Sequence, residues 1–153
     1  MPTVKRKNTS SIESDVNKIL KGDGIDIVEV DNIKMQTVTR LSELKARFPV
    51  GKTWAKRVVN TFNSAFFNSA TLICQNKGEG CRRHKHPDCD EFWIIMSGKI
   101  KFEIGENKEP NIVSQGDIVY LPKGTAHKVI VVSDEPSIRF SISVEAMRNI
   151  YYE

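Results

Sequence analysis

The chain has 153 residues, the size of one ordinary domain, and its 39% hydrophobic and 27% charged residues are a globular rather than a disordered or collagen-like composition. Its net charge of +4 is small and spread along the sequence, so we expect no nucleic-acid partner. No apolar run approaches the ~20 residues of a membrane span, and the N-terminus lacks the apolar stretch of a secretory signal. The sequence therefore predicts a cytoplasmic protein with no membrane contact.

The first 50 residues are predicted to form an arm that precedes the main domain, which we assign to residues 51–153. A capping-box pattern, Ser10-Ser-Ile-Glu13, predicts the start of a helix in this arm. The arm is expected to contain two short helices, over residues 11–21 and 41–48, and two short strands, over residues 25–30 and 33–39. The sequence thus predicts a short α/β extension ahead of the main domain.

The rhythm of the sequence changes at Thr53, where short β-rich runs begin to alternate with turn residues. The predicted strands cover residues 54–61, 66–75, 92–97, 99–104, 118–121, 127–132 and 137–144. Many short strands at this spacing indicate a sandwich or a barrel rather than alternating strands and helices. The predicted fold class of the main domain is therefore all-β.

The three histidines of the chain are not scattered. His84 and His86 are separated by one residue, Glu91 follows shortly after, and His127 lies on a later predicted strand. Residues i and i+2 of a strand share a face, so both imidazoles would point to one surface while Lys85 points away. Imidazoles with one carboxylate suit Fe(II), Mn(II), Ni(II), Co(II), Cu(II) or Zn(II) better than Ca(II) or Mg(II). The alternative is three surface or hydrogen-bonded histidines, and the pattern alone leaves both interpretations open.

Two longer patterns in the sequence resemble the motifs of the cupin superfamily. The first motif, G-x5-H-x-H-x3–4-E-x6-G, is present in full as Gly78-EGCRR-His84-Lys-His86-PDCD-Glu91-FWIIMS-Gly98. The second, G-x5-P-x-G-x2-H-x3-N, is present as Gly116-DIVYL-Pro122-Lys-Gly124-TA-His127-KVI-Val131. Val131 replaces the terminal Asn, a position that is often variable and is not a metal ligand. The strand pattern extends the resemblance over about residues 53–145 and leaves the first 50 residues uncovered.

The resemblance implies a double-stranded β-helix, or jelly-roll barrel, with one divalent transition-metal ion in its mouth. Carried over position by position, the implied metal ligands are His84, His86, Glu91 and His127. Fe(II) is the favoured ion, and Mn, Ni, Co, Cu or Zn are the alternatives. A homodimer is also an expectation from the superfamily.

Strand alternation predicts which other side chains face the site. Trp93 would share the face of Glu91, and Val129 and Val131 would share the face of His127. With Arg57, these three residues are the predicted substrate-binding residues, in a mostly apolar lining typical of a small-molecule pocket.

Two further residues are predicted to take part in the chemistry. Arg82 is in phase with His84 and could offer a guanidinium to an anion, or it could be a surface residue at the strand's start. Tyr120 is predicted to face inward and to transfer a proton. Phe92, Ile94 and Met96 would occupy the opposite strand face, covered by the N-terminal arm or by a second subunit.

The three cysteines Cys74, Cys81 and Cys89 are an odd set in a chain without a signal peptide, so we expect reduced thiols. Cys81 and Cys89 lie three residues to either side of the histidine pair. A disulfide or a redox switch is one interpretation, and free thiols with a packing role are the other.

The predicted function is a metal-dependent enzyme acting on a small molecule that is polar or anionic. Three neutral histidines and one glutamate around a divalent ion leave a residual charge of about +1, which favours an anionic or enolic ligand. A mononuclear iron dioxygenase, an oxidoreductase, is the first hypothesis. A lyase, a decarboxylase or a sugar isomerase or epimerase on the same scaffold is the next, and a non-catalytic sensor or small-molecule binding module is the third.

Overall fold

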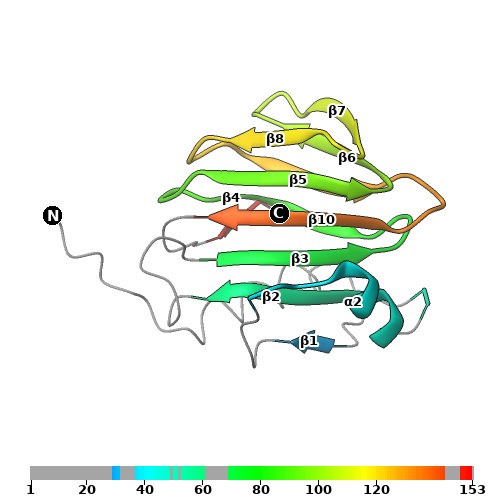
Figure 1. Ribbon diagram of the computed structural model, residues 1–153. Coiled ribbons are helices and arrows are strands. Elements are labelled where there is room, and N and C mark those ends of the chain that lie inside the picture. Colours follow the sequence, from blue (N-terminus) through cyan, green and yellow to red (C-terminus); the bar gives the residue numbers. More distant parts are fainter. Residues whose placement is uncertain are drawn as a thin grey trace, which may run out of the picture.

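The computed structural model of the protein describes residues 29–31, 37–48, 50–51, 53–60, 69–143 and 149–152, and these residues form two β-sheets and one short helix (Figure 1). The six-stranded sheet has the order β1-β2-β3-β10-β5-β8, and the five-stranded sheet has the order β11-β4-β9-β6-β7. Their bounds are β1 Glu29–Asp31, β2 Trp54–Asn60, β3 Ser69–Gln75, β4 Gly80–Lys85, β5 Glu91–Ser97, β6 Lys99–Ile104, β7 Glu109–Ser114, β8 Ile118–Leu121, β9 His127–Val131, β10 Ser137–Ser143 and β11 Ile150–Tyr151.

Neighbouring strands in both sheets are antiparallel, apart from β1, which pairs in parallel with β2. Strands that follow each other in sequence often lie in different sheets, as β4 and β5 do, so the chain winds between two facing layers. This arrangement is the double-stranded β-helix, and the fold class expected from the sequence is confirmed.

The main core lies between the two sheets and is built from alternating residues of their strands. On β5, Trp93 and Ile95 point inward together with Glu91, and Phe102 of β6 meets the ring of Trp93 edge-on at 6.2 Å between ring centres. The other members of this cluster are Ala55, Ile73, Cys81, Ile100, Val119, Leu121 and Val129. Burial of these side chains provides the main hydrophobic stabilisation of the barrel.

A second, smaller core lies on the outer face of the six-stranded sheet, beneath helix α2 (Leu41–Arg47), as Figure 1 shows. Leu44 of the helix is buried there, and the ring of Phe48 stacks on Trp54 of β2 with 4.8 Å between ring centres. The helix has Glu43 in its first turn and basic residues in its last turn, which suits the helix dipole. The helix predicted over residues 41–48 is therefore confirmed.

The structure corrects several predicted elements. The helix over 11–21 and the first part of the strand predicted over 25–30 lie outside the described residues, and β1 agrees with the end of that strand. Of the strand predicted over 33–39, the described residues 37–39 form none. The prediction also missed β7 and β11 and gave β4 no bounds. Strand β7 contains Pro110, which is tolerated there because β7 is the edge of its sheet.

Two further expectations concern the described residues. The three cysteines are all free and buried, so the expectation of reduced thiols is confirmed. No helix in the described part of the chain is both long and apolar enough to cross a membrane.

Candidate metal centre

Three buried histidines meet between the two sheets. His84 lies on β4, His127 is the first residue of β9 and its direct pairing partner, and His86 follows β4 by one residue. Each side chain is at most 3% exposed, and one ring nitrogen from each lies within 4.8 Å of the others. The convergence of the three imidazoles expected from the sequence is confirmed.

A β-bulge on β4 sets the direction of the first histidine. Cys81 pairs with Val129, yet His84 pairs with His127, so β4 carries one residue more than β9 over this stretch. The extra residue allows Cys81 and His84 to be buried together although three positions separate them. The bulge also turns Arg82 outward, so the prediction that Arg82 is in phase with His84 is wrong.

The turn between β8 and β9 fixes the other two histidines. Gly124 adopts a φ of 80°, in the left-handed region that favours glycine, and its N–H donates to the carbonyl of His86 at 2.7 Å. The Nδ1 of His127 lies 3.1 Å from the carbonyl of Thr125, and the Nδ1 of His84 lies 2.7 Å from the carbonyl of Arg82. Donation from Nδ1 leaves the lone pair on Nε2, which is the usual arrangement of a metal-binding histidine.

Glu91 brings a carboxylate to the same point from the opposite sheet. Its Oε2 lies 3.2 Å from Nε2 of His86 and 3.6 Å from Nε2 of His127, and its side chain is almost fully buried. Its Oε1 accepts a hydrogen bond of 2.8 Å from the hydroxyl of Ser141 on β10. The sequence analysis missed Ser141, because it alternates on β10 with the apolar Phe140 and Ile142, which suggest the opposite face as the buried one.

The electrostatics of the cluster keep the donors in the forms that bind metal. Burial, with the neighbouring His127 and His86, lowers the pKa of His84 to about 3, and burial also lowers the pKa of His127. Burial alone would raise the pKa of Glu91, but His86, His127 and the hydrogen bonds outweigh it and hold that pKa at about 2. The residues therefore fit a divalent ion, because Nε2 of His127 is buried with no hydrogen-bond partner and faces a charged carboxylate.

The depressed histidine pKa values predict acid sensitivity in the metal-free protein. Unfolded histidines take up protons below about pH 6.5, whereas folded His84 resists protonation down to about pH 3. We therefore expect the free energy of unfolding to fall with pH from about 6.5 downward, by up to about 1.4 kcal/mol per pH unit for His84. Denaturant unfolding at a series of pH values measures this slope. A His84→Ala variant should have a shallower slope, and equal stability at pH 7 and pH 5 would contradict the prediction.

The predicted substrate-binding residues divide into two groups. Trp93, Val129 and Val131 are buried inside the barrel on the faces that strand alternation predicted. Arg57 lies on β2 opposite Thr71, but its side chain is outside the described part of the chain.

Tyr120 does not face the histidines. On β8 it alternates with the buried Val119 and Leu121, it is half exposed, and its hydroxyl donates to the carboxylate of Asp90 at 3.0 Å. The expectation of an inward Tyr120 is therefore wrong, because β8 presents its other face to the core.

On the outer face of β5, Met96 packs against the cluster that contains Leu44 of the N-terminal arm, as expected. Phe92 packs beside Tyr120 and remains 43% exposed.

Arg82 is a surface residue, which is the second of the two interpretations that the sequence left open. Its side chain is exposed, and its guanidinium carbon lies 4.3 Å from the ring centre of Tyr151 on β11. The same tyrosine ring lies 5.6 Å from the ring of His84. The C-terminal strand therefore packs beside one metal-binding candidate, a contact that the sequence analysis missed.

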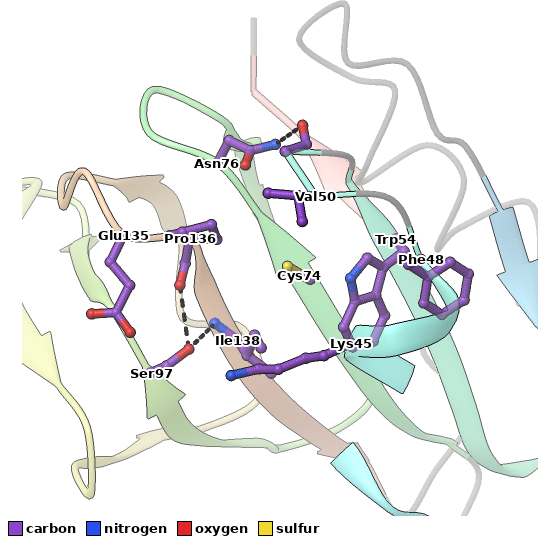
Figure 2. A pocket seen from close by; sticks show the side chains of 11 residues that line it. Lys45, Phe48, Val50, Trp54, Cys74, Asn76, Ser97, Glu135, Pro136 and Ile138 are labelled. Atoms are coloured by element: carbon purple, nitrogen blue, oxygen red, sulfur yellow. Dashed lines mark hydrogen bonds between the residues drawn. The ribbon is translucent and has the colours of Figure 1, made fainter. Parts of the chain in front are cut away.

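A groove of about 200 Å³ lies elsewhere, on the outer face of the six-stranded sheet beside α2 (Figure 2). Trp54, Cys74 and Ile138 form its apolar floor, and Lys45 and Glu135 lie at its edges. Burial raises the pKa of Cys74 to about 11, so this thiol stays protonated at neutral pH. The groove therefore lacks the reactive groups that the histidine cluster has.

Comparison with known proteins agrees with this fold. The sequence of residues 71–144 matches the family model of the cupin domain. The uncharacterized protein YdbB of Bacillus subtilis (strain 168) is 36% identical over 45 residues, which are 29% of this chain and 39% of that protein. The chain thus matches well under half of that relative's length.

Solved structures are similar at low sequence identity. An uncharacterized protein with a double-stranded β-helix domain from Klebsiella pneumoniae has a TM-score of 0.62 and 19% identity, over 77% of this chain and 98% of that chain. A cupin-like protein from Thermotoga maritima has a TM-score of 0.59 and 21% identity, over 80% and 88% of the two chains. The solved structures share the jelly-roll barrel fold. The family match over residues 71–144 supports the cupin superfamily membership that the two sequence motifs implied.

Proposed function

We propose that the protein is a metal-dependent enzyme that acts on a small polar or anionic metabolite, with dioxygenase-type oxidation as its reaction. The observation that carries this proposal is the convergence of three buried imidazoles with a buried carboxylate, contributed by both sheets. In the proposed site, His84, His86, His127 and Glu91 hold one divalent ion, with Fe(II) favoured by the reaction. Such an ion supplies Lewis-acid and electron-transfer chemistry when it is bound.

The chain's own residues have supporting roles in this proposal. The carbonyls of Arg82 and Thr125 orient two of the imidazoles, and Ser141 fixes the Glu91 carboxylate. The apolar side chains of Trp93, Val129 and the rest of the core exclude water from the inner side of the site. The substrate would therefore react in a site whose donors are already positioned.

The buried residues favour oxidation over proton-transfer chemistry. Among the described residues, Glu91 is the single buried carboxylate, and the half-buried Tyr151 beside His84 has its hydroxyl hydrogen-bonded by the side chain of Asn149. A lyase or an isomerase needs a general acid or base within reach of the substrate. An oxidation in which the ion carries the chemistry requires no such side chain, and this difference supports the dioxygenase.

Metal analysis and oxygen uptake test the proposal. Untagged protein, loaded anaerobically with Fe(II), should retain about one equivalent of iron and consume dioxygen with at least one member of a panel of small hydroxy acids, oxo acids and diketones. A His127→Ala variant should do neither. Substrate consumed without dioxygen would replace the oxidation by a lyase or isomerase reaction, and binding without turnover would indicate a sensor. Protein that cannot be loaded with any divalent transition metal would overturn the proposal.

A further inference from the structure

Strand β10 has an unusual inward face. Its inward side chains are polar, whereas the apolar ones point to the other face, where Ile138 is covered by α2 and its surroundings. The inward residues, all between 0% and 6% exposed, are Ser137, Arg139, Ser141 and Ser143. An inner strand of a barrel normally presents apolar residues to the core. These buried polar side chains therefore need hydrogen-bond partners, either from the protein or from a ligand.

Arg139 is the charged member of this row and is fully buried. Burial lowers the pKa of its guanidinium to about 10, so the group remains charged at neutral pH. Its Nη2 donates to Oε1 of Gln75, and its central carbon lies 5.0 Å from the ring centre of Trp93. Its Nε and Nη1 have no hydrogen-bond partner, and no carboxylate of the described residues lies within ion-pairing distance.

The surroundings offset this charge only in part. Burial lowers the pKa of Arg139 and the carboxylates of Glu91 and Glu79 raise it, but both carboxylates act from beyond ion-pairing distance. Gln75 is neutral, and its amide nitrogen is already committed to the carbonyl of Gly80 at 2.9 Å. The cation–π contact with Trp93 compensates only part of the cost, because a buried charge without a counter-ion costs several kcal/mol. Buried arginines are normally paired with a carboxylate. Because Arg139 has no such direct partner among the described residues, its guanidinium can bind an anion.

The position of Arg139 connects it to the metal centre. Ser141, the next inward residue on β10, hydrogen-bonds Glu91, and Trp93 is the next inward residue after Glu91 on β5. Alternate residues of a strand are about 7 Å apart, so Arg139 lies about one layer deeper in the barrel than Ser141. The Nε1 of Trp93 is also buried without a partner, and it provides a further N–H donor in the same region.

We propose that Arg139 binds a carboxylate of the substrate, so that the barrel takes a small molecule with one polar end at the metal centre and a carboxylate at the guanidinium. This proposal rests on the proposed function for the metal-bound end of the molecule. The separation of about one strand layer selects short molecules, in which a few carbon atoms separate the two polar ends. Arg139 is then the residue that makes the site specific for anionic rather than neutral metabolites.

Short dicarboxylates test the binding site directly. Oxalate, malonate and succinate are added at constant ionic strength, adjusted with sodium chloride, to metal-free protein and to protein loaded with Co(II). Thermal unfolding and the visible spectrum of cobalt are the two readouts. At least one dicarboxylate should raise the melting temperature of the wild type beyond the chloride control. In Arg139→Gln, its affinity should fall at least about 30-fold while the cobalt content stays at the wild-type level.

A matched control and a second variant separate binding from a structural role. Arg40→Gln removes the same charge from an exposed residue at the start of α2 and should retain the dicarboxylate response. In the absence of added anions, Arg139→Met should be at least as stable as the wild type, because it removes an unpaired buried charge. A lower stability of Arg139→Met would instead show that the guanidinium is needed to hold the barrel together.

The experiment distinguishes a failure of the carboxylate site from a failure of the proposed function. Cobalt that does not bind would overturn the metal-dependent enzyme, whereas the response of the metal-free protein would still test Arg139. No dicarboxylate response in either form, or an equal response in Arg139→Gln, would overturn the carboxylate site. If Arg139→Gln does not fold, a crystal structure of the wild type with malonate tests the site instead. A malonate carboxylate at the guanidinium of Arg139 would support the proposal, and its absence there would overturn it.

Discussion

Replacement of His86 by alanine is expected to lower the affinity for divalent transition metals by more than about 100-fold. This residue supplies one of three ring nitrogens that lie within 4.8 Å of one another, and it is also the nearest histidine to Glu91. Loss of a hydrogen-bond partner outside the donor set already costs a metal site about 10- to 100-fold, so loss of a donor should exceed that range. Metal analysis after dialysis and competition with a coloured chelator measure the change.

Cys89→Ser is the matched control for this experiment. Cys89 is buried three residues from His86 on the same loop, but its side chain is not one of the four proposed metal ligands. The serine variant should retain metal near the wild-type level, and its melting temperature should rise on metal addition as in the wild type. Retention of metal by His86→Ala, or equal loss in both variants, would contradict the assignment of the donors.

Gly80→Ala is expected to destabilise the protein by more than about 3 kcal/mol, a severe effect for one methyl group. A Cβ at this position would lie 1.8 Å from the carbonyl oxygen of Val129 and 2.6 Å from its carbonyl carbon. Both atoms belong to the backbone of β9, so no side chain can rotate away to make room. Relief would require β4 and β9 to separate beside the bulge that directs His84. Chemical denaturation of the metal-free protein measures the loss.

Gly116→Ala distinguishes this clash from the general effect of replacing a glycine. Gly116 has a φ of 91°, and an added Cβ would meet nothing within 4 Å. Only the backbone strain of a left-handed residue remains, which costs about 1–2 kcal/mol. Equal destabilisation in Gly80→Ala and Gly116→Ala would show that the contact between β4 and β9 is looser than described. Gly80→Ala should in addition lower metal affinity, whereas Gly116→Ala should leave it unchanged.

The sequence predicted the part of the site that depends on regular spacing. Alternation along β5 and β9 correctly placed Trp93 and Val131 in the barrel, because these strands are free of irregularities over those residues. The two motifs also identified the histidines that meet in space, although they lie on different strands. Local periodicity and motif spacing therefore sufficed for the barrel and for the imidazole cluster.

Features that depend on strand irregularities or on tertiary packing could not be predicted in this way. The extra residue in β4 reverses the direction of Arg82, and a bulge cannot be read from alternation alone. Tyr120 was assigned to the wrong face because β8 is short and its hydrophobic residues occupy both faces. Arg139 was missed because its strand has apolar residues on the outer face, which α2 partly covers, so the hydrophobic pattern pointed away from the polar interior.

The four proposed donors come from opposite layers of the barrel. His84 and His127 belong to strands of the five-stranded sheet, whereas Glu91 begins β5 of the six-stranded sheet. An ion held by all of them would clamp the two layers together at this end of the barrel. Metal occupancy would then also govern how readily that end opens, so amide hydrogens of β4, β5 and β9 should exchange with solvent more slowly in the loaded protein than in the empty one.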